Sequence, residues 1–360
     1  MKFGDLFHSI SNGKNIKQVK GDSQGLPISR IETISDGTVN FGKVGYADLQ
    51  AEPNKKWLLN AGDILFSHIN SPKYVGKSAI FEEGMSAMIH GMNLLRLAPN
   101  RDLIIPKYAL YLIRSEEFRS KLRKFINQSV NQASVSVSSL KSIPVEIPSL
   151  REQSKIVLEK DLQNVIGQKR EHQRELLAEL EKSVFIDMFG NPFTNPKKLP
   201  MVRLGDVAGV LTGNSPPRAD ESNFGSAIEW IKSNNLGGRI ATEAEEWLSK
   251  SGKQKARIAP AGSVLVTCIA GSPESIGKCS LVDRDVAFNQ QINAILPSEN
   301  LSAEFILMQL KTFPELVRQK SSGGMKGLVS KSQFSEIEIL NPDPILMKKF
   351  IDILQKEPGV

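Results

Sequence analysis

The chain has 360 residues, of which 40% are hydrophobic and 24% charged, a composition typical of a globular protein long enough for two domains. No apolar run approaches the roughly 18 residues of a membrane span, and the N-terminal stretch MKFGDLFHSI lacks the apolar core of a signal peptide, so we expect a cytoplasmic protein without membrane contact. The formal net charge of +7 is compatible with a polyanionic partner but does not identify one.

Residues 1–148 are expected to form a first domain rich in short strands. The runs GDILFS (62–67) and KSAIF (77–81) contain β-branched or aromatic residues and follow turn residues, which is typical of strands. KYALYLIRS (107–115) has the spacing of an amphipathic helix, and PVEIP (144–148) alternates like a half-exposed strand. These elements predict a mixed α/β domain.

Residues 149–192 have a different pattern and predict one long helix. No apolar residue occurs from Gly167 to Glu175, as in a helix that bridges two bodies or packs lightly. Gly190 is a plausible stop signal. A break at Gly167, which would give a helical hairpin, is the alternative. The apolar side chains predicted to pack this helix are Leu158, Leu162, Val165, Leu176, Leu180 and Val184.

Residues 193–342 repeat the first domain about 200 residues later. SPKYVGKSAIF (71–81) is matched by SPESIGKCSLV (272–282), and the helix at 107–115 by EFILMQLKT (304–312). Three further phrase pairs keep the same order. Residues 343–360 repeat the start of the long helix. We therefore predict an α+β fold with two tandem duplicated mixed α/β domains, a long helix between them and a short second helix at the C-terminus, with the boundaries 1–148, 149–192, 193–342 and 343–360.

The sequence carries no recognisable catalytic motif. The repeated Gly-Lys at Gly76 and Gly277 resembles part of a phosphate-binding loop, but the earlier glycine that this motif needs is Ser71 in one copy and Ser272 in the other. No dinucleotide fingerprint, nucleophile elbow or metal-ligand spacing is present. We expect no catalytic residue and no metal site, and we expect the two cysteines, Cys268 and Cys279, to be buried reduced thiols.

Two related but divergent domains joined by a stiff helix suit duplex DNA that is read at two half-sites. Phosphates attract Lys and Arg, and base edges are read by Arg, Asn, Gln, Lys or Ser at loop tips. A non-catalytic protein-interaction scaffold or dimerising adaptor without DNA readout is the alternative. The loop residues predicted to contact DNA are Lys14, Lys17, Lys20, His68, Asn70, Lys73, Lys77, Asn127, Gln128, Asn131, Gln132, Lys232, Asn234, Asn235, Arg239, Lys253, Lys255, Arg257, Lys278 and Lys326.

Several stretches resemble the specificity subunits of type I restriction–modification systems. LGDVAGVLTGNSPP (204–217), AGSVLVTCIAGSPESIGK (261–278) and FNQQINAI (288–295) are similar to target recognition domains. IPSLREQSKIVLEKDL (147–162) and ELLAELEKSVFIDMFGNP (175–192) look like the central conserved region of that family. The order of domain, helix, domain and helix extends the resemblance along essentially the whole chain.

The resemblance implies a subunit that selects a DNA sequence and catalyses nothing. Each recognition domain would read one half of a bipartite target in double-stranded DNA. The helices would set the spacer and dock methyltransferase (M) subunits, through which restriction (R) subunits join. This chain would hold no cofactor, because S-adenosylmethionine, ATP and Mg²⁺ would belong to the partners. The second helix is shorter than in the family, which suggests a shortened chain or a helix from another molecule, with a homodimer through the helices as one consequence.

Overall fold

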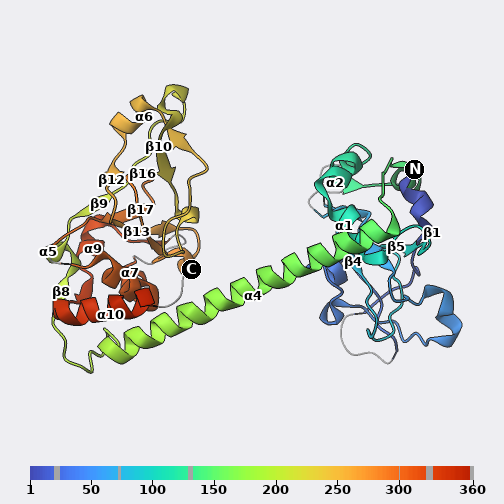
Figure 1. The fold of residues 1–360 in the computed structure, drawn as a ribbon, viewed down its shortest axis with the longest axis horizontal. Coiled ribbons are helices and arrows are strands. Elements are labelled where there is room, and N and C mark those ends of the chain that lie inside the picture. Colours follow the sequence, from blue (N-terminus) through green and yellow to red (C-terminus); the bar gives the residue numbers. More distant parts are fainter. Residues whose placement is uncertain (20–24, 72–73, 129–132, 300, 322–326, 357–360) are drawn as a thin grey trace. The chain divides into compact units, whose positions relative to one another are not determined.

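The computed structural model describes residues 1–19, 25–71, 74–128, 133–299, 301–321 and 327–356. They form two compact units, Met1–Arg170 and Glu171–Val360, whose elements are drawn in Figure 1. The division between the units falls inside one long helix, α4 (Leu150–Phe189). The predicted DNA contacts that lie outside the described residues are Lys20, Lys73, Asn131, Gln132 and Lys326.

The first unit is built on a four-stranded antiparallel sheet in the order β1-β5-β2-β4. A small second sheet has the order β3-β7-β6. The strands are β1 (Phe7–Asn12), β2 (Ile64–Phe66), β3 (Ile69–Asn70), β4 (Ser78–Ile80), β5 (Leu95–Pro99), β6 (Asn127–Gln128) and β7 (Ala133–Ser134), and the α-helices before α4 are α1 (Pro106–Arg114), α2 (Glu116–Arg123) and α3 (Val137–Ser142).

Both faces of this sheet are buried. Successive side chains of a strand point to opposite sides, and in β2 the side chains on each side join an apolar cluster. Ile64 and Phe66 of β2 join one apolar cluster, which also contains Ile113 of α1. Leu65, between them, joins a second cluster with Ile34 from the segment that connects β1 to β2. Double-sided burial explains why β2 consists of three consecutive apolar residues.

The second unit repeats this arrangement with the order β9-β17-β13-β15. Within β13, Val264 and Val266 face one apolar cluster and Leu265 faces another. The strands of this unit are β8 (Met201–Arg203), β9 (Val210–Thr212), β10 (Phe224–Ile231), β11 (Trp247–Leu248), β12 (Ile258–Ala259), β13 (Val264–Thr267), β14 (Ile269–Ala270), β15 (Cys279–Leu281), β16 (Val286–Phe288), β17 (Ile292–Ile295), β18 (Gly327–Leu328) and β19 (Glu338–Leu340). Its further α-helices are α5 (Leu204–Val207), α6 (Lys250–Lys255), α7 (Ala303–Thr312), α8 (Glu315–Arg318), α9 (Lys331–Ser335) and α10 (Pro344–Lys356).

The repeated Gly-Lys phrase forms the same turn in both units. Gly76 and Gly277 have φ angles of +87° and +84°, which an L-residue adopts only with strain. The N–H of Gly76 donates to the Ser67 carbonyl over 2.8 Å, and that of Gly277 donates to the Thr267 carbonyl over 2.9 Å. The glycines therefore serve a turn between two framework strands. The predicted tandem duplication is confirmed at the level of strand order.

The two units differ most between the first and second strands of the framework sheet in chain order. In the second unit this segment, with β16, forms a four-stranded sheet in the order β11-β10-β16-β12. Among the described residues of the first unit, the same pairing consists of isolated bridges, parallel between Ile28 and Ile89 and antiparallel between Leu58 and Ile89. We call residues 213–263 of the second unit, together with β16, the outer layer.

One predicted strand is wrong. Residues 144–148 form a single bridge, between Pro144 and Lys2. The Phe3 N–H donates to the Ile143 carbonyl over 2.8 Å and the Val145 N–H to the Met1 carbonyl over 2.9 Å, and the pairing stops at Met1, where the partner segment starts. In the second unit the partner segment is longer, and β19 pairs with β8 over three residue pairs.

Helix α4 is continuous through Gly167, so the predicted long helix is confirmed and the alternative of a hairpin is wrong. Its first turn is capped by Ser149, whose Oγ donates to Glu152 Oε2 over 2.7 Å and accepts from the Glu152 N–H over 3.4 Å. Gly190 follows the helix with a φ of +78°.

The last turns of α4 and the short helix α10 pack together in the core of the second unit. Phe185 and Phe189 of α4 and Phe350 of α10 are all fully buried. The ring centroid of Phe350 lies 5.6 Å from that of Phe185 and 5.3 Å from that of Phe189, both edge-on. The predicted short C-terminal helix is confirmed. No helix in the described parts of the chain is long and apolar enough to cross a membrane.

Candidate nucleic-acid interface

The outer layer of the second unit brings several of the predicted cations together. In Figure 1, α6 and β10 lie at the end of this unit that is remote from α10. Helix α6 begins at Lys250, where the Ser249 side chain accepts from the Gly252 N–H, a standard N-cap. The helix carries Lys253 and Lys255, and Arg257 follows it.

These three cations differ in how firmly they are held. The Lys253 side chain is exposed. Lys255 Nζ lies 3.2 Å from Asp220 Oδ2 and 2.8 Å from Asn223 Oδ1, so its charge is partly neutralised. Arg257 Nη1 donates to the Thr212 carbonyl over 2.7 Å, and its side chain is exposed.

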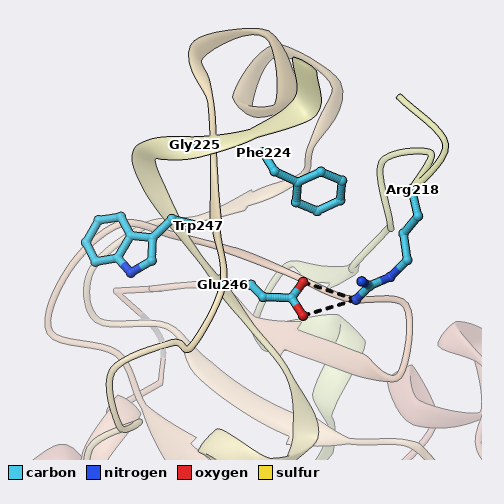
Figure 2. A pocket seen from close by; sticks show the side chains of 5 residues that line it. All are labelled: Arg218, Phe224, Gly225, Glu246 and Trp247. Carbon is cyan, nitrogen blue, oxygen red and sulfur yellow. Dashed lines mark hydrogen bonds and ion pairs between the residues drawn. The ribbon is translucent and has the colours of Figure 1, made fainter. Parts of the chain in front are cut away.

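A second cationic group lines an open hollow of about 360 Å³ beside β10 and β11. Figure 2 shows Arg218 directed at Glu246, with the Phe224 ring beside the ion pair and Trp247 on the side of Glu246 away from Arg218. Arg218 Nη2 lies 3.3 Å from Glu246 Oε1 and 3.1 Å from Oε2. Lys232 Nζ contacts Oε1 of the same carboxylate over 2.5 Å. One acid therefore holds two cations, and a positive charge remains.

The carboxylate at the centre of this group stays ionised. The hydrogen bond from Lys232, reinforced by that from Arg218, holds the pKa of Glu246 below its ordinary value. The Arg218 guanidinium carbon also lies 5.5 Å from the Trp230 ring centroid and 5.9 Å from that of Phe224, within cation–π range.

Lys232 was among the predicted contacts, whereas Arg218, Glu246 and Trp247 were not. No motif marks these three residues, since Arg218 reaches the adjacent Glu246 and Trp247 from the loop before β10. The residue type of Trp247 was an available signal, because large aromatic side chains are enriched at binding surfaces. In the structure this side chain is 40% exposed.

Asn235 and His68, both predicted to contact DNA, are buried. Asn235 is 5% exposed, and its Nδ2 donates to the Glu243 carbonyl over 2.8 Å. His68 is 6% exposed, and burial lowers its pKa. A DNA contact needs a surface side chain, so we remove both from the candidate set. Asn234, next to Asn235, is exposed and stays in it.

Arg239 binds within its own unit. Its guanidinium lies 3.5 Å from Glu181 of α4 and 3.6 Å from Glu304 of α7. Both partners are acids, so this arginine is better placed to attach the loop after β10 to the helices than to attract a phosphate.

In the first unit the predicted cations do not form a comparable group among the described residues. Lys17 is exposed and Lys14 is half-buried. Lys77 Nζ donates to the Ser35 carbonyl over 2.5 Å and lies 4.5 Å from the Tyr74 ring centroid. Its counterpart in the second unit, Lys278, is exposed. The other predicted side chains in this region are the half-buried Asn70 and the exposed Asn127 and Gln128.

Most of the predicted packing face of α4 is uncovered by the described residues of the chain. Leu158 is 70% exposed and Leu176 is 52% exposed. Val184 alone in this set is half-buried, against the apolar core of the second unit. The other exposed members are Leu162, Val165 and Leu180. We call Leu158, Leu162, Val165, Leu176 and Leu180 the apolar stripe of α4.

The two cysteines are buried free thiols, as predicted. Burial raises the pKa of Cys268 and of Cys279 to about 12, which keeps both thiols protonated. Within the described ranges no group of three or more His, Cys, Asp or Glu side chains is arranged to hold a metal ion.

The sequence also matches known proteins. The family model of the type I restriction modification DNA specificity domain matches residues 1–182 and again residues 196–356. The chain is 34% identical over 252 residues to a Methanocaldococcus jannaschii protein assigned as the MjaX type I restriction enzyme specificity subunit, covering 66% of this chain and 59% of that protein. It is 30% identical over 171 residues to the HindI specificity subunit of Haemophilus influenzae, covering 45% of this chain and 36% of the relative. The chain thus matches less than two thirds of the length of either relative.

A solved structure supports the fold. The type I restriction–modification S subunit from M. genitalium aligns over 99% of this chain and 89% of its own, with a TM-score of 0.54 and 13% identity. The family model matches twice, once over each copy of the duplicated framework, and together the matches cover nearly all of the sequence. The chain therefore belongs to the family of type I restriction–modification DNA specificity proteins.

Proposed function

We propose that the chain is the sequence-reading subunit of a type I restriction–modification complex. Each unit would bind one half of a bipartite duplex target. One observation carries this proposal: the two units share a framework sheet of the same strand order but differ in the segment between its first two strands. A constant framework with a variable outer segment suits two sites that bind the same polymer at different sequences.

The covalent chemistry would come from partners. Methyltransferase subunits would bring S-adenosylmethionine, restriction subunits would bring the ATP- and Mg²⁺-dependent steps, and this chain would catalyse nothing. The apolar stripe of α4 supports a docking role, because exposed apolar side chains at helical spacing are typical of helix-to-helix contacts. Either a methyltransferase subunit or a second copy of this chain would cover it.

The proposal is tested by expressing the chain with its methyltransferase partner and sequencing the methylated bases of the host. We expect one split motif. Exchanging residues 200–342 for the corresponding segment of a relative should change one half of the motif and leave the other half intact. Exchanging residues 1–148 serves as the matched control and should change only the other half.

A protein-interaction scaffold is the competing function. It predicts that the methyltransferase still binds the chain but that no motif appears and neither exchange alters methylation. The family match favours DNA specificity over this alternative.

A further inference from the structure

Arg218 stands apart from the other cations of the outer layer. Its side chain is 63% exposed, yet one guanidinium nitrogen, Nη2, is held by both oxygens of Glu246. Its Nη1 and Nε have no hydrogen-bond partner among the residues that the structure describes. Lys232, which shares Glu246, is only 25% exposed. Arg218 therefore offers a fixed guanidinium with open donors at the surface.

The rings beneath Arg218 restrict its motion further. The guanidinium lies over Trp230 and Phe224, and the Trp230 indole N–H donates to the Asn214 carbonyl over 3.3 Å. A free arginine side chain loses up to about 2 kcal/mol of rotamer freedom when it binds. Packing against rings that are themselves fixed removes part of that loss before a ligand arrives.

Stability does not account for this arrangement. A largely exposed Arg–Glu pair contributes little to the free energy of unfolding. Arg284 provides a contrast within the same unit: its partner Glu229 is buried, and the guanidinium also contacts the Thr242 carbonyl. Arg284 ties the outer layer together, whereas Arg218 borders an open hollow with Trp247.

We propose that Arg218 reads a guanine in the half-site bound by the second unit, with Glu246 and the Trp230 and Phe224 rings as positioning residues. The second hydrogen of Nη2, together with Nη1 or Nε, gives the guanidinium an edge with two adjacent donors, which matches the O6 and N7 acceptors that guanine presents in the major groove. Trp247, at the edge of the hollow, is placed to contact an apolar part of the neighbouring base or sugar. This inference rests on the proposed function, since it names the residue that one recognition unit uses.

The test uses the full chain with its methyltransferase partner. Methylated-base sequencing with the wild-type chain gives the split motif, and exchange of residues 200–342 assigns one half to the second unit. That half should contain at least one specified G·C pair. In Arg218→Ala we expect that one position to accept other base pairs, with discrimination reduced about 10- to 100-fold. The half read by the first unit should stay unchanged.

Two variants separate base reading from other roles. Lys253→Ala removes an exposed cation of the same layer, and it should weaken binding to all duplexes alike without relaxing any position. Arg218→Gln keeps a long polar side chain and should shift the preference at that position towards A·T, because a glutamine amide pairs with adenine N6 and N7. If Arg218→Ala folds poorly, the base preference of Arg218→Gln at this position tests the inference instead.

Several outcomes would overturn the inference. Arg218 would be a phosphate contact if Arg218→Ala behaved like Lys253→Ala. An unchanged motif in both Arg218 variants, or a half-site with no specified G·C pair, would also overturn the inference that Arg218 reads a guanine. Absence of any methylated motif with the wild-type chain would instead refute the proposed function itself.

Discussion

Asn235 and Thr33 occupy equivalent places in the two units. The Asn235 Oδ1 accepts from the Lys232 N–H over 3.0 Å, and the Thr33 Oγ1 accepts from the Arg30 N–H over 2.8 Å. Both side chains are buried and both belong to a short 3₁₀ turn. An asparagine that looks like a base reader in a polar loop is, in the fold, a capping residue repeated in both units.

Replacing Asn235 should therefore change stability rather than DNA specificity. Asn235→Ala leaves the Lys232 N–H and the Glu243 carbonyl without their partner, which should lower the free energy of unfolding by about 1–3 kcal/mol. Urea denaturation measures this change. Asn234→Ala, at the exposed neighbouring position, is the control and should stay within about 0.5 kcal/mol of the wild type. A variant at Asn235 with full stability and an altered motif would contradict this assignment.

His90 is the most strongly perturbed histidine of the first unit. Its Nε2 contacts the Leu94 carbonyl over 2.9 Å, and its buried Nδ1 has no hydrogen-bond partner among the described residues. Burial, together with the nearby Arg96 and His68 charges, lowers its pKa from 6.5 to about 4. The ring is therefore neutral in the folded chain at neutral pH.

This shift predicts acid sensitivity. Between pH 6.5 and about 4 the unfolded chain binds a proton that the folded chain does not, so the free energy of unfolding falls as the pH falls. The full loss amounts to about 3 kcal/mol. His90→Gln can keep a donor to Leu94 without a titrating ring, and it should flatten the dependence of urea stability on pH in this window. An unchanged slope in the variant would exclude His90 as the cause.

At the scale of elements, α4 combines a buried end with an uncovered stripe. Phe185 and Phe189 are fully buried, while Leu176 and Leu180 are exposed one turn apart, on the same face of the helix. Acidic side chains at Leu176 and Leu180 would leave the core intact and would oppose any apolar partner.

The double variant Leu176→Glu/Leu180→Glu should fold normally and lose binding to the methyltransferase partner by at least about 10-fold. Co-purification and analytical ultracentrifugation report this loss, together with any self-association. Lys182→Glu changes the net charge by the same amount on a different face of the helix, and it should bind normally. Equal binding by both variants would show that the apolar stripe is not the docking surface.

Elements with strong local signals were predictable from the sequence. The helices near 107–115 and 304–312 and the long helix appear where the apolar spacing places them, as α1, α7 and α4. The strand expected at 144–148 is limited to one bridge, because its partner segment starts at Met1 and offers no residue beyond it. Alternation alone reports which side chains face the core and says nothing about the length of the partner strand.

The candidate site was less predictable than the fold. Exposed loop cations such as Lys253 could be named from composition, but Arg218 meets the adjacent pair Glu246 and Trp247 only through a tertiary contact across 28 residues of sequence. The burial of Asn235 likewise depends on a tertiary contact. Residue type predicted the chemistry of the surface, and topology selected which side chains reach it.

At the scale of the whole molecule, binding to DNA should depend steeply on salt. If the complex of the chain with its methyltransferase forms about 6–10 phosphate contacts, its affinity for duplex DNA should fall by roughly 10³- to 10⁵-fold between about 50 and 200 mM salt, through counterion release. Fluorescence anisotropy over a salt series measures the slope, and Lys253→Ala should reduce it by about one. Salt-independent binding would argue against a polyanionic ligand.

In both units the segment between the first two framework strands in chain order starts and ends at strands that pair with the same third strand. β9 and β13 both pair with β17, as β1 and β2 both pair with β5, so the two ends of each segment are anchored about 10 Å apart. The entropy of closing a loop grows only slowly with its length. Recombination between these anchors can therefore exchange one outer segment for another at little cost to folding. If each unit reads one half-site, as proposed, such an exchange would change one half of the target at a time and leave the rest of the molecule unchanged.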